Sequence, residues 1–200
     1  MTHPRPRQLL AAATFVAFDL ETTGMDPRLD RVVALGAVRF TYEGEMSATY
    51  DELVHPGRRI PPQAVAVHGI DDESVRGRPA LEDVLPRFRA FVGEAVPVTY
   101  MGAFDLAFLR GPLRRARQPA LERVLDTAVL ASRLLAPLPE LSLEALCARL
   151  RLSADGRHTA VGDARLAARI FLELLPLLHR RGARTLHDAL DWGDVTRATV

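Results

Sequence analysis

Short apolar runs and longer amphipathic stretches follow one another along the chain. Residues 14–20 form an apolar run rich in β-branched and aromatic side chains, which predicts a buried strand. Residues 31–42 and 46–54 predict two further strands, and the Glu43-Gly44-Glu45 segment between them indicates a hairpin. We therefore expect the chain to begin with an antiparallel meander.

After residue 80, apolar positions recur at helical spacing and are interrupted by short apolar runs. We expect the proline-rich segment 56–72 to be irregular, strands at 96–100 and 123–125, and helices at 81–92, 104–117, 127–135, 142–150, 160–175 and 185–190. Because proline removes a backbone donor, we expect a bend or break near Gly111-Pro112 and a stop or kink at Pro176. A meander followed by alternating helices and strands predicts an α/β domain of three layers around a mixed central sheet.

The composition is that of a globular protein with one main domain. Of the 200 residues, 48% are hydrophobic and 26% are charged, which excludes a disordered or collagen-like chain. We expect a mobile N-terminal tail over residues 1–10, the main domain over 11–182, and a short C-terminal helix with a tail over 183–200. Basic residues number 26 against 25 acidic ones, so the net charge of +1 neither supports nor excludes a nucleic-acid partner.

Two features bear on the compartment. The apolar run over residues 9–18 is too short to span a bilayer and leads into acidic residues instead of a cleavage site, so we expect no membrane association. Cys147 is the single cysteine and cannot form an internal disulfide. A reducing, cytoplasmic location is therefore expected.

Asp19 and Glu21 close the first predicted strand. Side chains alternate along a strand, so both carboxylates point to the same face, about 6.6 Å apart along the strand. An acid-x-acid triplet also arises by chance in a chain with 25 acids. The position of this triplet, between an apolar strand and a loop that contains Gly24, favours a functional site, because α/β proteins place their sites at the carboxyl ends of strands.

Two further acids are predicted to point inward from helices. Asp105 shares a helix face with apolar residues, or else caps the start of that helix. Asp163 lies on the apolar stripe of the helix over residues 160–175, where an unpaired charge is costly. His158, which precedes this helix, is either part of a site or an ordinary surface histidine.

Clustering of these four carboxylates predicts a metal site. Their mutual repulsion raises pKa values unless cations are bound, and oxygen ligands favour Mg²⁺ or Mn²⁺ over zinc. Two such ions about 3.5–4 Å apart form a clamp for phosphoryl transfer. A histidine with an ordinary pKa of about 6.5 is suited to take a proton from the attacking water.

Several short motifs occur in a fixed order. They are D-L-E-T-T-G at 19–24, F-D-x-x-F-L at 104–109 and H-x-x-x-x-D at 158–163, with L-G-A-V at 35–38, H-P-G-R-R-I-P at 55–61, V-H-G-I-D-D at 67–72 and L-D-T at 125–127 between them. Together they resemble the DnaQ-like 3′–5′ exonucleases of the DEDDh class, which is named for four acids and a histidine. The resemblance extends over residues 14–180, and the ordered set is far more specific than any one motif.

The resemblance implies a ribonuclease-H-like fold and two Mg²⁺ or Mn²⁺ ions. By position, it implies that Asp19 bridges both metals, that Glu21 and Asp163 hold the first, and that Asp105 supports the second. His158 is implied to be the general base. The residues implied to receive the 3′-terminal nucleotide are Thr22, Thr23, Met25 and Phe104. Asp126 is implied to be a supporting acid of the site.

The function implied by the resemblance is a metal-dependent 3′–5′ exonuclease that hydrolyses single-stranded or frayed DNA to nucleoside 5′-monophosphates in proofreading or repair. Its partners are then a nucleic acid with a free 3′ end and, in some settings, a DNA polymerase subunit. The same catalytic set also serves exoribonucleases that trim RNA 3′ ends. A catalytically silent nucleic-acid-binding module is a third alternative.

One departure from the family pattern leaves rate and substrate preference open. Tyr100 and Met101 stand where the family often has His-Asn, and only this change suggests the silent module. A basic stretch follows the second motif and suits either a nucleic-acid backbone or a solvated helix face: Arg110, Arg114, Arg115 and Arg117.

Overall fold

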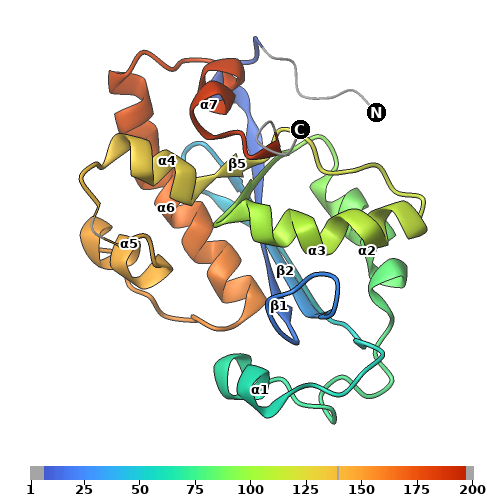
Figure 1. Ribbon diagram of the computed structural model, residues 1–200. Coiled ribbons are helices and arrows are strands. Elements are labelled where there is room, and N and C mark those ends of the chain that lie inside the picture. The colour runs from blue at the N-terminus through green and yellow to red at the C-terminus, as the bar shows by residue number, and fades with distance from the viewer. Residues whose placement is uncertain (1–6, 139, 197–200) are drawn as a thin grey trace.

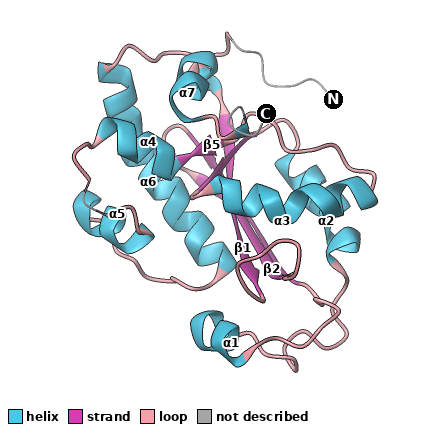
Figure 2. Ribbon diagram, viewed as in Figure 1, coloured by secondary structure: helices cyan, strands magenta, loops and turns pink. Residues whose placement is uncertain are grey.

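A five-stranded sheet lies at the centre of the fold (Figure 2). The computed structural model describes residues 7–138 and 140–196. The strands are β1 (Thr14–Thr22), β2 (Val32–Thr41), β3 (Met46–Leu53), β4 (Val96–Thr99) and β5 (Leu125–Asp126). Their order is β3-β2-β1-β4-β5, with β1–β2 and β2–β3 antiparallel and β1–β4 and β4–β5 parallel. The predicted antiparallel meander and mixed sheet are confirmed.

Helices cover both faces of this sheet (Figure 1). One face packs against α2 (Leu81–Val92) and α3 (Gly102–Arg115). The opposite face is covered by α4 (Thr127–Leu134), α5 (Leu143–Leu150), α6 (Ala160–Arg180) and α7 (Leu186–Gly193). The predicted three-layer α/β arrangement is therefore confirmed.

Alternation along β1 divides the core between the two helical layers. Phe18 belongs to the core beneath α2 and α3. Phe15 faces the other layer, where its ring centroid lies 4.9 Å from that of Phe171 on α6. Because side chains repeat every two residues, Asp19 and Glu21 continue the row that begins at Phe15 and face the α6 layer.

Two helices continue through prolines at which we expected an interruption. Pro112 lies inside α3 and Pro176 lies inside α6, so α3 is not broken at Pro112 and α6 does not stop at Pro176. Each proline removes one backbone hydrogen bond, but apolar burial on its C-terminal side keeps the chain helical. Leu113 is 2% exposed and Leu178 is 0% exposed, which shows that each helix still faces the core beyond its proline.

The proline-rich segment 56–72, which we expected to be irregular, contains the short helix α1 (Pro62–His68). Pro62 stands at its first position, where a missing backbone donor costs nothing. Gly69 ends it with a left-handed φ of 72°. A small apolar cluster around Ile60 holds the segment against β2, and α1 contributes Val67 to the pocket described below.

The beginning of the described chain pairs with the segment that leads into α7. Leu9 forms a bridge with Thr185, and the backbone nitrogen of Leu10 donates to the carbonyl of Arg184 at 3.0 Å. Of the two predicted tails, residues 1–6 and 197–200 lie outside the described residues. In the described part of the chain, no helix combines the length and the apolar character that crossing a membrane requires.

Candidate active site

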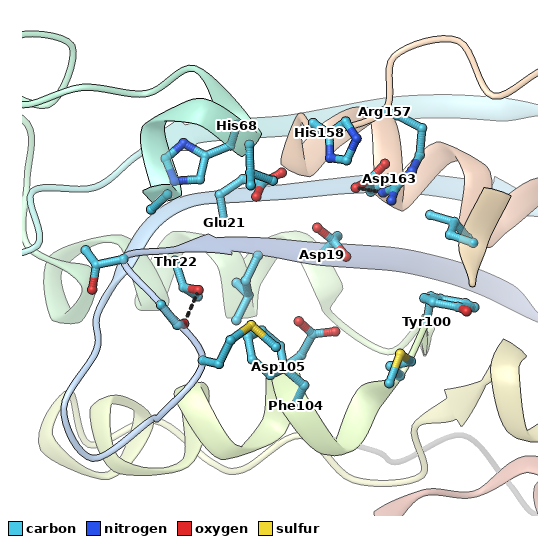
Figure 3. A pocket seen from close by; sticks show the side chains of 18 of the residues that line it. Asp19, Glu21, Thr22, His68, Tyr100, Phe104, Asp105, Arg157, His158 and Asp163 are labelled. Atoms are coloured by element: carbon cyan, nitrogen blue, oxygen red, sulfur yellow. Dashed lines mark hydrogen bonds and ion pairs between the residues drawn. The ribbon is translucent and has the colours of Figure 1, made fainter. Parts of the chain in front are cut away.

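Three carboxylates from two elements converge at the carboxyl end of β1 (Figure 3). Asp19 and Glu21 lie on β1, and Asp163 lies in the first turn of α6. One carboxylate oxygen from each lies within 4.8 Å of the others. Glu21 is 9% exposed and Asp163 is 6% exposed, so the cluster is largely shielded from water. Asp163 points inward, as its place on the apolar stripe of its helix predicts.

A glycine lets α6 approach the sheet closely enough to form this cluster. Gly36 on β2 pairs with Asp19 in the β1–β2 register. A methyl group at Gly36 would lie 2.1 Å from the backbone nitrogen of Val161 and 2.2 Å from the carbonyl carbon of Ala160. The first turn of α6 therefore rests directly on the β2 backbone, and this contact brings Asp163 to Asp19.

Asp105 approaches the same pocket from the first turn of α3. Its side chain is 2% exposed, and its Oδ2 accepts a hydrogen bond from Thr99 Oγ1 at 2.5 Å. Thr99 ends β4, which is the neighbour of β1 in the sheet. Asp105 is not one of the three carboxylates that lie within 4.8 Å of one another, but it interacts electrostatically with Asp19. The four predicted acids thus reach one pocket from three elements.

Asp126 organises the starts of α3 and α4. Its Oδ2 accepts from the backbone nitrogen of Gly102 at 2.8 Å, and its Oδ1 accepts from that of Ala128 at 2.8 Å. The backbone nitrogens of Met101 and Val129 donate to the same carboxylate at 3.3 Å. Met101 has a left-handed φ of 56°, and these hydrogen bonds offset the cost of that conformation. Asp126 therefore supports the element that carries Asp105.

His158 lies at the mouth of the pocket, in the loop before α6. Its side chain is exposed, and its backbone has a left-handed φ of 62°. The next residue, Thr159, caps α6 by accepting a hydrogen bond from the backbone nitrogen of Gly162 at 3.1 Å. The cap fixes the loop so that the imidazole and Asp163 lie on the same side of the pocket (Figure 3).

A basic residue that the sequence analysis did not single out also lies in this pocket. Arg157 forms a charged hydrogen bond from Nη1 to Asp163 Oδ2. Its Nε donates to Glu144 Oε1 at 2.7 Å, and its Nη2 donates to the same oxygen at 2.5 Å. No motif marks Arg157 or Glu144, because the two residues are 13 positions apart and meet only when α5 packs beside α6.

The whole pocket has a volume of about 590 Å³. The predicted nucleotide-contact residues lie together in a part of it away from His158 and Arg157 (Figure 3). Thr22 ends β1, Thr23 and Met25 come from the loop that follows, and Phe104 comes from α3. Met25 is 78% exposed, so its side chain is free to contact a ligand. The hydroxyl of Thr23 instead donates to Asp30 Oδ1 at 3.1 Å, a contact that closes the loop.

Burial raises the pKa of each of the four acids, and repulsion between carboxylates adds to the rise at Asp19, Glu21 and Asp105. Burial raises the pKa of Glu21 from 4.5 to about 7, and the charge of Asp163 adds to the rise. Burial, and then the charges of Asp105, Asp163 and Glu21, raise the pKa of Asp19 well above its ordinary value. Burial likewise raises the pKa values of Asp105 and Asp163, although Arg157 opposes the rise at Asp163.

The donor set fits a divalent cation. Asp163 Oδ1 is buried and has no hydrogen-bond partner in the described part of the structure. The three converging ligand atoms are all carboxylate oxygens, which Mg²⁺ and Mn²⁺ prefer. A divalent cation in this position would satisfy the unpaired oxygen and neutralise the repulsion that raises the pKa values.

Comparison with known proteins assigns the family. A family model described as Exonuclease matches residues 16–171. A DNA polymerase III subunit epsilon-like protein of Rhodobacter capsulatus is 40% identical over 176 residues, which cover 86% of this chain and 25% of that protein. The DNA polymerase III subunit epsilon of Aquifex aeolicus is 33% identical over 170 residues, which cover 84% of each. The chain spans between 11% and 30% of several longer relatives, including 13% of a PolC-type DNA polymerase III from Thermotoga petrophila.

Solved structures have the same fold. Exonuclease X, in complex with 5′ overhanging duplex DNA, aligns with a TM-score of 0.66 and 26% identity over 88% of this chain and 99% of its own. The nuclease domain of 3′hExo, a DEDDh family member bound to rAMP, aligns with a TM-score of 0.71 and 18% identity over 82% of this chain and 92% of its own. The ribonuclease-H-like fold implied by the motifs is thereby confirmed. This chain belongs to the exonuclease family, as the family model and the epsilon subunit of Aquifex aeolicus show.

Proposed function

We propose that this protein is a metal-dependent 3′–5′ exonuclease that releases nucleoside 5′-monophosphates from single-stranded or frayed DNA ends. The observation that carries the proposal is the meeting of four acids and a histidine around one pocket: Asp19, Glu21, Asp105, His158 and Asp163. The name of the Aquifex aeolicus relative supports DNA as the substrate, and it supports proofreading beside a DNA polymerase as the setting.

We infer that Asp19, Glu21 and Asp163 hold one divalent metal and that Asp19 and Asp105 hold a second. Mg²⁺ and Mn²⁺ suit these oxygen donors, and when bound they activate the attacking water and stabilise the leaving oxyanion. Ligating carboxylates must be deprotonated. Because the pKa of Glu21 is raised to about 7 in the metal-free protein, metal affinity should fall as the pH drops through this value.

His158 acts as the general base in this proposal. Its exposed position at the pocket mouth lets the imidazole pass a proton from the attacking water to solvent. The nearby Asp163 carboxylate stabilises the imidazolium that forms, since the two groups attract each other. The helix cap at Thr159 limits the movement of the base between turnovers.

The terminal base contacts Met25 and Phe104 in this proposal, while Thr22 and the Thr23 backbone line the path of the sugar and phosphate. Apolar contact with a base face is independent of sequence. It requires an unpaired base, so a single-stranded or frayed end is the preferred substrate. This expectation separates the enzyme from one that acts on intact duplex ends.

The test is digestion of 3′- and 5′-labelled single-stranded DNA and RNA of one sequence, with Mg²⁺, Mn²⁺ or EDTA. We expect DNA to shorten from its 3′ end only with metal, and Asp19→Asn to lower the rate by roughly 10³-fold. Asp83→Asn is the matched control, because Asp83 is an exposed acid on α2. Preferred cleavage of RNA would replace the DNA assignment with RNA trimming. Failure to cleave either polymer would contradict the proposal.

A further inference from the structure

The guanidinium of Arg157 occupies the acid cluster although Arg157 belongs to none of the five DEDDh positions. Its Nη1 reaches Asp163 Oδ2, and its Nε and Nη2 both reach Glu144 Oε1. The Arg157 side chain is 21% exposed, so it lies inside the pocket wall and not on the open surface. One cation therefore joins two carboxylates that differ in their surroundings.

The two carboxylates lie at different depths. The Asp163 side chain is 8% exposed and belongs to the three converging acids. The Glu144 side chain is 50% exposed, lies in the first turn of α5, and is not one of those three acids. Arg157 thus has an inner partner within the cluster and an outer partner beside it.

The charge of Arg157 acts on the whole cluster. It opposes the rise in pKa at Asp19 and Glu21 as well as at its direct partner, Asp163. Closely spaced carboxylates need such a positive charge when no other cation is present. A divalent cation bound by the same oxygens would supply more charge than Arg157 does and would repel the guanidinium.

We propose that Arg157 is an exchangeable counter-ion of the metal site: it neutralises the acids while no divalent cation is bound, and on metal binding it leaves Asp163 and remains held by Glu144. This inference rests on the metal site of the proposed function. Two of the three hydrogen-bonding nitrogens of Arg157 already face Glu144, so the outer contact survives the exchange. The neighbouring His158 loop therefore stays anchored in both states.

The exchange predicts opposite effects of two substitutions on metal affinity. Arg157→Gln removes the competitor for Asp163 and should tighten Mn²⁺ binding by about tenfold, the change that corresponds to one charge-assisted hydrogen bond. In EDTA, Arg157→Gln should also have a lower Tm than the wild type, and added Mn²⁺ should remove most of this difference in Tm. Glu144→Gln leaves Asp163 as the single carboxylate partner of Arg157 and should weaken Mn²⁺ binding.

A double-mutant cycle separates exchange from a simple effect of charge at a distance. If Arg157 mediates the effect of Glu144, Glu144→Gln weakens Mn²⁺ binding in the wild-type background but changes it little when Arg157→Gln is also present. If Glu144 acts on the metal only through space, the loss is the same in both backgrounds. Glu144 is half exposed, so its substitution leaves the fold intact and keeps the cycle interpretable.

The experiment is isothermal titration of each full-length variant with Mn²⁺ at pH 8, together with Tm measurements in EDTA and in Mn²⁺. Arg114→Gln, on the exposed face of α3, is the matched control and should bind Mn²⁺ as the wild type does. Unchanged Mn²⁺ affinity in Arg157→Gln, or equal losses in the two backgrounds of the cycle, would overturn the inference alone. Absence of Mn²⁺ binding by the wild type would overturn both the inference and the metal site on which it rests.

Discussion

Replacing Glu21 by glutamine should remove a large part of the pH dependence of stability in the metal-free protein. In the folded state Glu21 is 9% exposed and lies beside Asp163, and these surroundings raise its pKa from 4.5 to about 7. In the unfolded chain the carboxyl returns to its ordinary range. Folding therefore favours the protonated form of Glu21.

The sign of the effect follows from proton binding. Below pH 4.5 the carboxyl is protonated in both states, and the stability linked to its raised pKa is fully present. As the pH rises through about 7 the buried group ionises and this stability is lost. The rise in pKa from 4.5 to about 7 corresponds to about 3 kcal/mol in the free energy of unfolding. About 2.5 kcal/mol of this is lost between pH 5 and pH 8.

Urea unfolding in EDTA at pH 5 and pH 8 measures this contribution. Between pH 5 and pH 8 the free energy of unfolding should fall by about 2.5 kcal/mol more in the wild type than in Glu21→Gln. Glu173→Gln is the matched control, since Glu173 is an exposed residue of α6 and its loss should leave the wild-type pH dependence unchanged. Parallel pH profiles for the wild type and Glu21→Gln would refute the reasoning that burial and repulsion raise the pKa of Glu21.

Three further substitutions test how the site is positioned. Gly36→Ala would set a methyl group 2.1 Å from the α6 backbone, so it should lower the free energy of unfolding, measured with urea, by about 1–3 kcal/mol. It should also lower kcat/KM, measured by nuclease kinetics, by roughly 100-fold. Asp126→Ala leaves four backbone donors without their acceptor and should lower the free energy of unfolding by about 3 kcal/mol; a loss below 0.5 kcal/mol would contradict the clamp. Thr99→Val removes the hydroxyl that donates to Asp105 and should lower kcat by about tenfold while the circular dichroism spectrum stays unchanged.

Local sequence patterns account for much of the fold and for the acids of the site. The strand alternation that places Phe15 in the core also places Asp19 and Glu21 on one face, and the helical stripe places Asp163 inward. These are properties of neighbouring residues, so the sequence carries them directly. A break at Pro112 and a stop at Pro176 do not occur, because burial of the residues that follow the two prolines outweighs the local loss of a hydrogen bond.

Other parts of the site depend on contacts between distant segments. The need for a glycine at position 36 arises from the backbone of α6, which crosses β2 there. The hydrogen bond from Thr99 to Asp105 forms because β4 ends beside the first turn of α3. The link from Arg157 to Glu144 likewise requires α5 and α6 to pack together. None of these partners repeats with a helical or strand period, so no local pattern predicts them.

Anomalous scattering from a crystal of the wild-type protein grown with Mn²⁺ is the most direct test of the metal site. We expect Mn²⁺ density in contact with the carboxylates of Asp19, Glu21 and Asp163, with the Arg157 guanidinium paired to Glu144. Crystals of Asp19→Asn should lack that density. A wild-type crystal in saturating Mn²⁺ with no density at these carboxylates would contradict the assignment of the acid cluster as the catalytic metal site.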